Sequence, residues 1–183
     1  MNKVQIFENG LDEDLRQELY LDAVSKIKDP TFYGWKTNYS WNNKIIDASH
    51  VVLSREYDEI TKLRILENLI KHRIIDAEEN VNYTVLNYAW TKLSYIPWHN
   101  DGRSYQAITI YLNDVWDENW GGIYLYNDNG LIKGILPSPN RCVKNVSDLM
   151  HTVTPVHLNA PGCRITIQIF STIKDEFLND SNP

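Results

Sequence analysis

The segment YIPWHNDG contains two residues that can bind a metal ion, His99 and Asp101. If this segment is a short strand, the two side chains project from the same side, because side chains alternate along a strand with a period of two. They could then share one ion, and a third ligand would come from another strand. His151, in the strand-like segment MHTVTPV, is the candidate. Two histidines and one carboxylate on one face of an ion suit an Fe(II) centre that activates oxygen.

The His-x-Asp pair is a weak indication by itself. Five histidines and 24 acidic residues make an H-x-D or H-x-E sequence common by chance in a chain of 183 residues. A single histidine is usually an ordinary hydrogen-bonded residue, and that is the interpretation for His50, His72 and His157. The metal-site hypothesis therefore depends on the elements around the pair.

After residue 80 nearly the whole chain has the pattern of β-strands, and two strands carry polar residues on one face. In QAITIYLN, Ile108 and Ile110 alternate with Thr109 and Tyr111. The segment CRITIQIF repeats the pattern, with isoleucines on one face and, on the other, Arg164, Thr166, Gln168 and Phe170. Such a sheet either has one face in water or belongs to a small barrel or jelly roll with a polar pocket. Alternation alone does not choose between them.

Before residue 80, apolar residues at spacings near 3.6 predict two helices. The residues that predict them are Leu15, Leu19, Ala23, Val24 and Ile27 for the first and Ile60, Leu63, Leu66, Leu69 and Ile70 for the second. Ser54 is the expected N-cap of the second helix. Residues 31–53 are expected to form short extended pieces, TFYGW and HVVLS, joined by a polar and aromatic loop.

Length and composition indicate one globular domain over residues 1–183. We expect helical support and edge strands in 1–80, the main β-structure in 81–172 and a tail in 173–183. The net charge of -6 argues against a nucleic-acid or anionic membrane surface as partner. No apolar run is long enough to span a membrane, and the first residues do not resemble a secretory signal, so a cytoplasmic location is the expectation. Cys142 and Cys163 are expected to be reduced, structural residues.

Five blocks between about Tyr83 and Phe170 resemble, in order, the prolyl 4-hydroxylase-like branch of the Fe(II)/2-oxoglutarate-dependent oxygenases. VLNYAWTKLSYIPWHND is similar to the strand that leads into the family's H-x-D motif. AITIYLNDVW and GGIYLY resemble its YLN strand and the Gly-Gly before the next strand. LPSPNRCVKNVSDLMHTVTPV resembles the turn-strand-turn segment that leads into the distal histidine. CRITIQIF resembles the strand with the basic residue that pairs with the cosubstrate. The resemblance implies a mainly β, α+β fold: a double-stranded β-helix, or jelly-roll and cupin-like, core with N-terminal supporting helices.

The resemblance implies roles for the positions that match its motifs. His99, Asp101 and His151 would bind Fe(II), and Arg164 would pair with the distal carboxylate of 2-oxoglutarate. A guanidinium group suits that role because it can bind a carboxylate with two parallel hydrogen bonds. Tyr111 matches the tyrosine that joins this carboxylate contact. Three more residues are expected in the cosubstrate pocket, Tyr88 from a looser match and Thr166 and Gln168 from strand alternation.

Two departures from the family pattern concern spacing. Arg164 lies thirteen residues after His151, three or four more than is usual, which predicts a longer turn before its strand. Trp98 displaces the tyrosine before the H-x-D motif, Tyr95, by one position. A β-bulge there would restore the orientation of the strand.

The implied activity is hydroxylation of an unactivated C–H bond with Fe(II), 2-oxoglutarate and O2, releasing succinate and CO2. A peptidyl residue, proline first, is the favoured substrate, and a free amino acid or small metabolite is the main alternative, because a fold does not determine a substrate. If residues 36–49 and 91–95 close over the site, a small substrate is favoured. If these residues leave an open channel, a peptide substrate is favoured. Two other classes remain open: a jelly roll that binds a ligand or partner without catalysis, and a cupin-like metalloenzyme that does not use 2-oxoglutarate. The sequence does not predict an oligomeric state.

Overall fold

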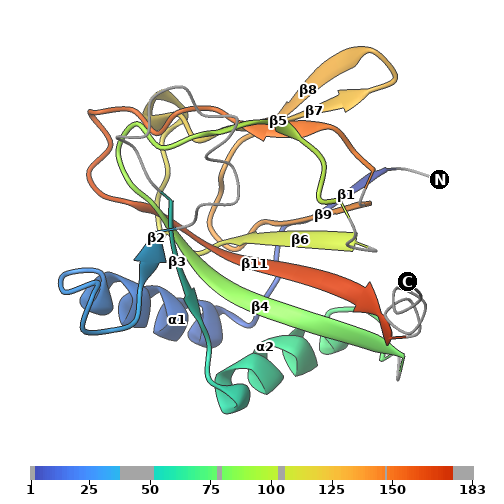
Figure 1. The fold of residues 1–183 in the computed structure, drawn as a ribbon, viewed down its shortest axis with the longest axis horizontal. Coiled ribbons are helices and arrows are strands. Elements are labelled where there is room, and N and C mark those ends of the chain that lie inside the picture. Colours follow the sequence, from blue (N-terminus) through green and yellow to red (C-terminus); the bar gives the residue numbers. More distant parts are fainter. Residues whose placement is uncertain (1–2, 38–51, 78–79, 103–105, 147, 175–183) are drawn as a thin grey trace, which may run out of the picture.

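The computed structural model describes residues 3–37, 52–77, 80–102, 106–146 and 148–174. Two antiparallel sheets face each other, and two helices lie behind the larger sheet (Figure 1). No helix among the described residues is both long enough and apolar enough to cross a membrane.

The larger sheet combines strands from both halves of the chain. Its longest pairing joins β11 to β4 over ten residue pairs, and β6 lies on the other side of β11. In order across the sheet the strands are β1 (Val4–Phe7), β9 (Cys142–Val146), β6 (Gln106–Tyr111), β11 (Arg164–Ile173), β4 (Val81–Trp90), β3 (Val52–Glu56) and β2 (Lys36–Thr37).

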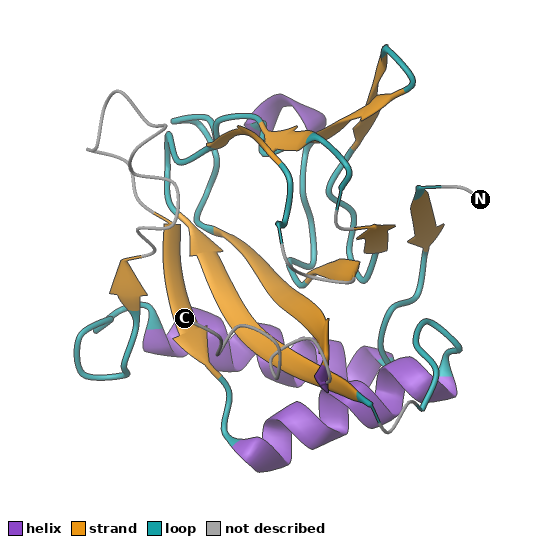
Figure 2. Cartoon of the chain, turned by 45° about the vertical axis from the view of Figure 1, so that its right-hand side comes forward, coloured by secondary structure: helices purple, strands orange, loops and turns teal. Residues whose placement is uncertain are grey.

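The smaller sheet carries the two histidines of the predicted metal site. In order, its strands are β5 (Ile96–His99), β10 (His151–Val153), β7 (Tyr124–Asp128) and β8 (Leu131–Ile135). A short 3-10 helix, η2 (Glu118–Trp120), precedes β7. The hairpin of β7 and β8 projects beyond the rest of the chain (Figure 2).

Helices α1 (Glu13–Lys26) and α2 (Glu59–Lys71) cover the outer face of the larger sheet. The core between helices and sheet is built from Leu15, Leu19 and Ala23 of α1, Ile65 and Leu69 of α2, and Ile108, Ile110, Ile165, Ile167 and Ile169 of the strands. Fully burying a side chain of this size contributes about 1.5–3 kcal/mol. The isoleucine faces therefore hold the strands against the helices, and the opposite faces turn toward the smaller sheet.

Both predicted helices are confirmed, but the buried side of α2 differs from the predicted stripe. From the predicted stripe, Leu69 is buried and Leu66 packs against the core, whereas Ile60 is 75% exposed and Leu63 is 55% exposed. Ile65, which lies outside that stripe, is fully buried. The difference arises because α2 is short. Over so few turns, two adjacent stripes of apolar residues both fit a 3.6-residue period. Only contact with the sheet decides which stripe is buried.

Two local predictions were wrong. Ser54 does not cap α2, because it lies within β3 opposite Tyr88. The cap is Asp58, whose carboxylate accepts a hydrogen bond from the backbone N–H of Thr61 at 2.8 Å. The TFYGW piece forms a turn over residues 31–34 and not a strand, and β2 starts after it. Part of HVVLS does form β3, while His50, Val51 and the tail from residue 175 lie outside the described residues.

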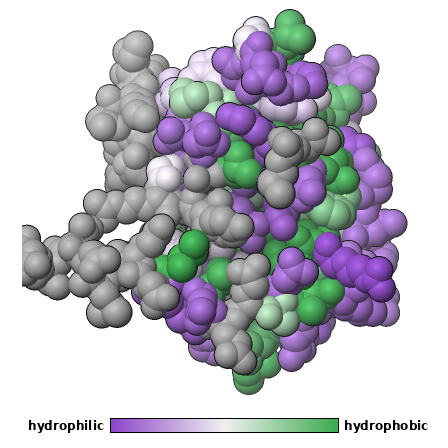
Figure 3. All heavy atoms as spheres, turned by 90° about the vertical axis from the view of Figure 1, so that its right-hand side faces the viewer, coloured by the Kyte–Doolittle hydropathy of each residue, from purple (hydrophilic) through white to green (hydrophobic). Residues whose placement is uncertain are grey.

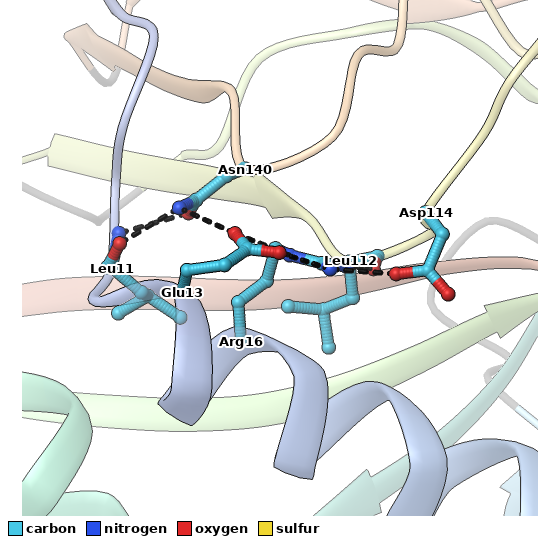
Figure 4. Close-up of polar contacts among 6 residues, drawn as sticks. All are labelled: Leu11, Glu13, Arg16, Leu112, Asp114 and Asn140. Atoms are coloured by element: carbon cyan, nitrogen blue, oxygen red, sulfur yellow. Dashed lines mark hydrogen bonds and ion pairs between the residues drawn. The ribbon is translucent and has the colours of Figure 1, made fainter.

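The end of β6 is tied to α1 by a polar network (Figure 4). The buried guanidinium of Arg16 donates to the backbone carbonyl of Leu112 and, at 2.6 Å, to the carboxylate of Asp114. Asn140 bonds both backbone groups of Leu11, accepting at 2.9 Å and donating at 2.7 Å. The segment that follows Tyr111 is thus fixed by hydrogen bonds as well as by packing.

On the face of the molecule shown in Figure 3, the hydrophobic residues of the described ranges do not form one large patch. There, green residues of the described ranges lie in small groups among purple ones.

Candidate metal centre and cosubstrate pocket

His99, Asp101 and His151 lie together at the edge of a cavity between the two sheets. His99 and His151 face each other across the pairing of β5 with β10, and Asp101 follows β5 directly. The Oδ1 atom of Asp101 is 3.9 Å from Nε2 of His99 and 3.8 Å from Nε2 of His151. All three ligand atoms lie within 4.8 Å of one another, so one ion can reach all of them.

Backbone carbonyls orient both imidazole rings. Nδ1 of His99 donates to the carbonyl of Pro97 at 2.8 Å, and Nδ1 of His151 donates to that of Leu149 at 2.9 Å. A carbonyl oxygen can only accept, so Nδ1 carries the proton in each ring. The neutral ring then presents the lone pair of Nε2 to Asp101 and to a metal ion, as ligating histidines commonly do.

Trp98 adds one residue between Tyr95 and the H-x-D motif, and β5 accommodates it with an irregular register. His151 is opposite His99 and Val153 is opposite Ile96, so three steps along β5 match two along β10. The predicted β-bulge is therefore present, and it keeps His99 directed inward.

Asn145 on β9 supports the carboxylate of Asp101. Its Nδ2 donates to Oδ2 of Asp101 at 3.1 Å and lies 3.2 Å from the carbonyl of Val146. The amide is buried, and it fixes Oδ2 so that Oδ1 turns toward the histidines. Sequence reasoning missed Asn145, and the signal that could have found it was a polar residue on the same strand face as the buried Val143.

Replacing Asn145 with alanine should lower Fe(II) affinity about ten-fold or more, because removing an outer partner of a metal ligand typically costs 10–100-fold. Anaerobic Fe(II) titration of the purified variant measures the effect. Asn119→Ala, at an exposed position on η2, is the control and should bind Fe(II) like the wild type. Equal Fe(II) affinity in Asn145→Ala and wild type would show that the amide does not act on Asp101.

Arg164 lines the same cavity, with 1% of its surface exposed. Its guanidinium carbon is 4.1 Å from the ring centroid of Trp90 and 5.5 Å from that of Tyr111. Burial lowers the pKa of Arg164 to about 10, which still leaves the group charged at neutral pH. Among the described residues, no carboxylate forms an ion pair with Arg164, and its Nε has no hydrogen-bond partner. A buried cation without a counter-ion indicates a site for an anionic ligand.

Gly122 holds the guanidinium in place. Its carbonyl accepts a hydrogen bond from Nη1 of Arg164, and its φ of +66° is a conformation that favours glycine. A Cβ atom at this position would lie 3.0 Å from Cδ of Arg164. Gly122, in the Gly-Gly sequence before β7, therefore contacts the residue that carries the charge.

Gly122→Ala should therefore weaken binding of 2-oxoglutarate in addition to straining the backbone. Gly130→Ala is the matched control, since Gly130 has a φ of +90° and a Cβ atom added there would meet no other atom within 4 Å. Both variants should lose about 1–2 kcal/mol of unfolding free energy in urea. Only Gly122→Ala should raise the dissociation constant of 2-oxoglutarate, and identical constants for the two variants would exclude an action through Arg164.

The remaining predicted pocket residues occupy two different positions. Tyr111, Tyr88 and Gln168 line the cavity, and the hydroxyl of Tyr111 is buried with no hydrogen-bond partner among the described residues. Burial raises the pKa of Tyr111, so it remains a phenol. Thr166 lies behind the lining, where its Oγ1 accepts from Nε1 of Trp90 at 3.0 Å and from Nε2 of Gln168 at 3.3 Å. Thr166 thus supports lining residues.

The other histidines have ordinary partners. Nε2 of His72 lies 3.0 Å from the carboxylate of Asp12, and Nδ1 of His157 donates to the carbonyl of Asn119 at 2.7 Å. Both agree with their interpretation as hydrogen-bonded residues. The longer turn predicted before Arg164 is present over residues 157–163.

Comparison with known families identifies the superfamily. The family model described as the 2OG-Fe(II) oxygenase superfamily matches residues 83–172, which include all three candidate ligands and Arg164. The chain belongs to this superfamily. Its members use Fe(II), 2-oxoglutarate and O2, so this chain is a 2-oxoglutarate-dependent dioxygenase. A comparison with curated protein sequences gave no match.

Solved structures of this superfamily share the fold. A prolyl-4-hydroxylase from Pseudomonas putida is 13% identical, with 94% of each chain covered and a TM-score of 0.70. A prolyl hydroxylase from Trichoplax adhaerens, solved with a hypoxia inducible factor peptide fragment, is 15% identical, with 100% of this chain and 89% of that chain covered and a TM-score of 0.77. HygX from Streptomyces hygroscopicus, solved with nickel and 2-oxoglutarate, is 9% identical, with 94% and 84% covered and a TM-score of 0.66.

These similarities confirm the predicted fold class, a double-stranded β-helix core with supporting helices. The cavity in this structure resolves the ambiguity left by strand alternation. The polar faces of β6 and β11 point into a cavity between the sheets and not into water. The residues present fit the superfamily's cofactors, because the three-ligand cluster and a buried guanidinium without a counter-ion share that cavity.

Proposed function

We propose that this dioxygenase hydroxylates an unactivated C–H bond of a peptidyl residue, with proline as the first candidate. In this proposal residues 1–183 act as one oxygenase domain. His99, Asp101 and His151 bind Fe(II), while Arg164 and Tyr111 bind the distal carboxylate of 2-oxoglutarate. The observation that carries these assignments is that one cavity is lined both by a metal-ligand cluster and by a buried cation without a counter-ion.

The bound Fe(II), 2-oxoglutarate and O2 supply the C–H oxidation, with succinate and CO2 as the other products. The chain's own residues bind and orient. The carbonyls of Pro97 and Leu149 fix the tautomer of the two histidines, and the guanidinium of Arg164 aligns the dicarboxylate. Apolar side chains of the lining, including Ile96, Val153 and Phe170, limit the access of water. No residue needs to act as a general acid or base.

Two features support a peptide substrate. The sequence resembles the prolyl-hydroxylase branch, and the whole chain aligns with the Trichoplax enzyme whose structure contains a peptide fragment. Two segments were expected to distinguish the substrates. In one of them, residues 91–95, the backbone N–H of Leu93 donates to the carbonyl of Val156, and the N–H of Val156 donates to the carbonyl of Ser94. In the other segment, residues 38–49 lie outside the described part of the chain.

A small polar metabolite is the second candidate. The observation that favours it is the fold shared with HygX, for which a structure with hygromycin B is 10% identical and has a TM-score of 0.65. The cavity chemistry at Arg164 is the same for both candidates, so the substrate must be found by experiment.

Mass spectrometry can separate the two candidates. A host-cell lysate is divided into protein and small-molecule fractions, and each is incubated with Fe(II), 2-oxoglutarate and air. The proposal predicts a gain of one oxygen on a peptidyl residue with wild type and none with Asp101→Ala. A gain of one oxygen found only in the small-molecule fraction would overturn the peptide assignment.

A further inference from the structure

Tyr124 on β7 is a buried residue of the cavity that has no assigned role. Its side chain is 3% exposed and lines the cavity together with the ligand cluster and Arg164. Its hydroxyl is buried and has no hydrogen-bond partner among the described residues. Buried polar atoms are nearly always paired, so an unpaired hydroxyl in a cavity indicates a ligand that completes the bond.

Strand β7 places Tyr124 close to both the Arg164 contact and the ligand cluster. Two residues earlier, the carbonyl of Gly122 holds Arg164. The ring of Tyr124 stacks on that of His151, with centroids 5.0 Å apart and an interplanar angle of 24°. A ligand that reaches from the guanidinium to the metal therefore passes the phenol.

The hydroxyl of Tyr124 can donate a hydrogen bond. The ligand group that suits such a donor in a site of low water content is a carboxylate oxygen, which accepts a charge-assisted bond.

We propose that Tyr124 is a further cosubstrate-binding residue, whose hydroxyl donates a hydrogen bond to a carboxylate oxygen of the bound 2-oxo dicarboxylic acid. The inference rests on the proposed ligand roles of Arg164 and the iron cluster, and it adds a donor that no motif predicts. Together with Arg164 and Tyr111 it accounts for the three unpaired side-chain donors of the cavity that the structure describes.

Tyr124→Phe separates this role from a structural one. The ring and its stacking on His151 are retained, while the unpaired hydroxyl is lost. Without ligand, the variant should unfold at the same or a higher urea concentration than wild type, because an unsatisfied buried group destabilises a fold. A hydroxyl with a purely structural bond would give the opposite result.

Calorimetric titration of the Fe(II)-loaded protein with 2-oxoglutarate, without oxygen, tests the proposal. The dissociation constant of Tyr124→Phe should rise about ten-fold, while its Fe(II) affinity stays at the wild-type value. Tyr126→Phe is the matched control, since its ring lies 6.2 Å from that of Tyr124 on the same strand, and its constant should not change.

Two outcomes would overturn the proposal in different ways. If wild type binds 2-oxoglutarate and Tyr124→Phe binds it within two-fold of the same constant, the hydroxyl does not contact the cosubstrate, while the proposed function stands. If wild type itself does not bind 2-oxoglutarate, the proposed function and this inference fail together.

Discussion

Replacing His151 with alanine should reduce oxygenase turnover to background. The remaining ligands, His99 and Asp101, lie on one short segment and cannot enclose an ion as three ligands do. Loss of a partner that only supports a ligand already costs 10–100-fold in metal affinity, so loss of the ligand itself should cost more than about 100-fold. Anaerobic Fe(II) titration and succinate formation measure the two effects.

The matched control is His157→Ala. His157 lies six residues further along the chain, and its Nδ1 also donates to a backbone carbonyl, but it is exposed and outside the cluster. This variant should keep wild-type Fe(II) affinity and turnover. Full turnover in His151→Ala would remove His151 from the metal site.

Replacing Arg164 with alanine should weaken 2-oxoglutarate binding about 100-fold or more and leave Fe(II) affinity nearly unchanged. Truncating one partner of a buried, hydrogen-bonded charge pair typically costs 2–5 kcal/mol, and here the second partner is the ligand's distal carboxylate. Arg164→Lys should recover only part of the affinity, because an ammonium group cannot form two parallel bonds to a carboxylate. Calorimetry without oxygen gives both constants.

Arg64→Ala is the control for a general loss of positive charge. Arg64 on α2 forms an exposed ion pair with Glu18 on α1, so its removal should not alter the binding of either ligand. If Arg164→Ala lost metal and 2-oxoglutarate affinity equally, its assigned role would be wrong, and a collapse of the whole pocket would explain the result.

The candidate site could be predicted from strand alternation together with the resemblance to the family's motifs. His99 and Asp101 at i and i+2 share a side, and Arg164 alternates with isoleucines that must face the core. The two departures in spacing were also interpreted correctly from the sequence. The extra residue at Trp98 forms a bulge, and the extra residues before Arg164 form a turn. Local spacing cannot predict which residues of separate strands lie together. The resemblance to the family supplied that pairing for His99 and His151.

The missed residues act through contacts that no local pattern encodes. Asn145 reaches Asp101 across 44 residues of sequence, and the carbonyl of Gly122 reaches Arg164 across 42. Tyr124 resembles an ordinary packing aromatic until the fold brings β7 against His151. The N-cap and the buried stripe of α2 depend in the same way on how the helix meets the sheet. Tertiary contact, and not propensity, decides these features.

One cavity is proposed to bind both Fe(II), through His99, Asp101 and His151, and 2-oxoglutarate, through Arg164. Anaerobic titration of the metal-free protein with Fe(II) and then 2-oxoglutarate tests this central claim most directly. We predict a weak visible charge-transfer band that appears only when both are present, followed by succinate when oxygen is admitted. Wild-type protein that gives neither the band nor succinate would contradict the claim.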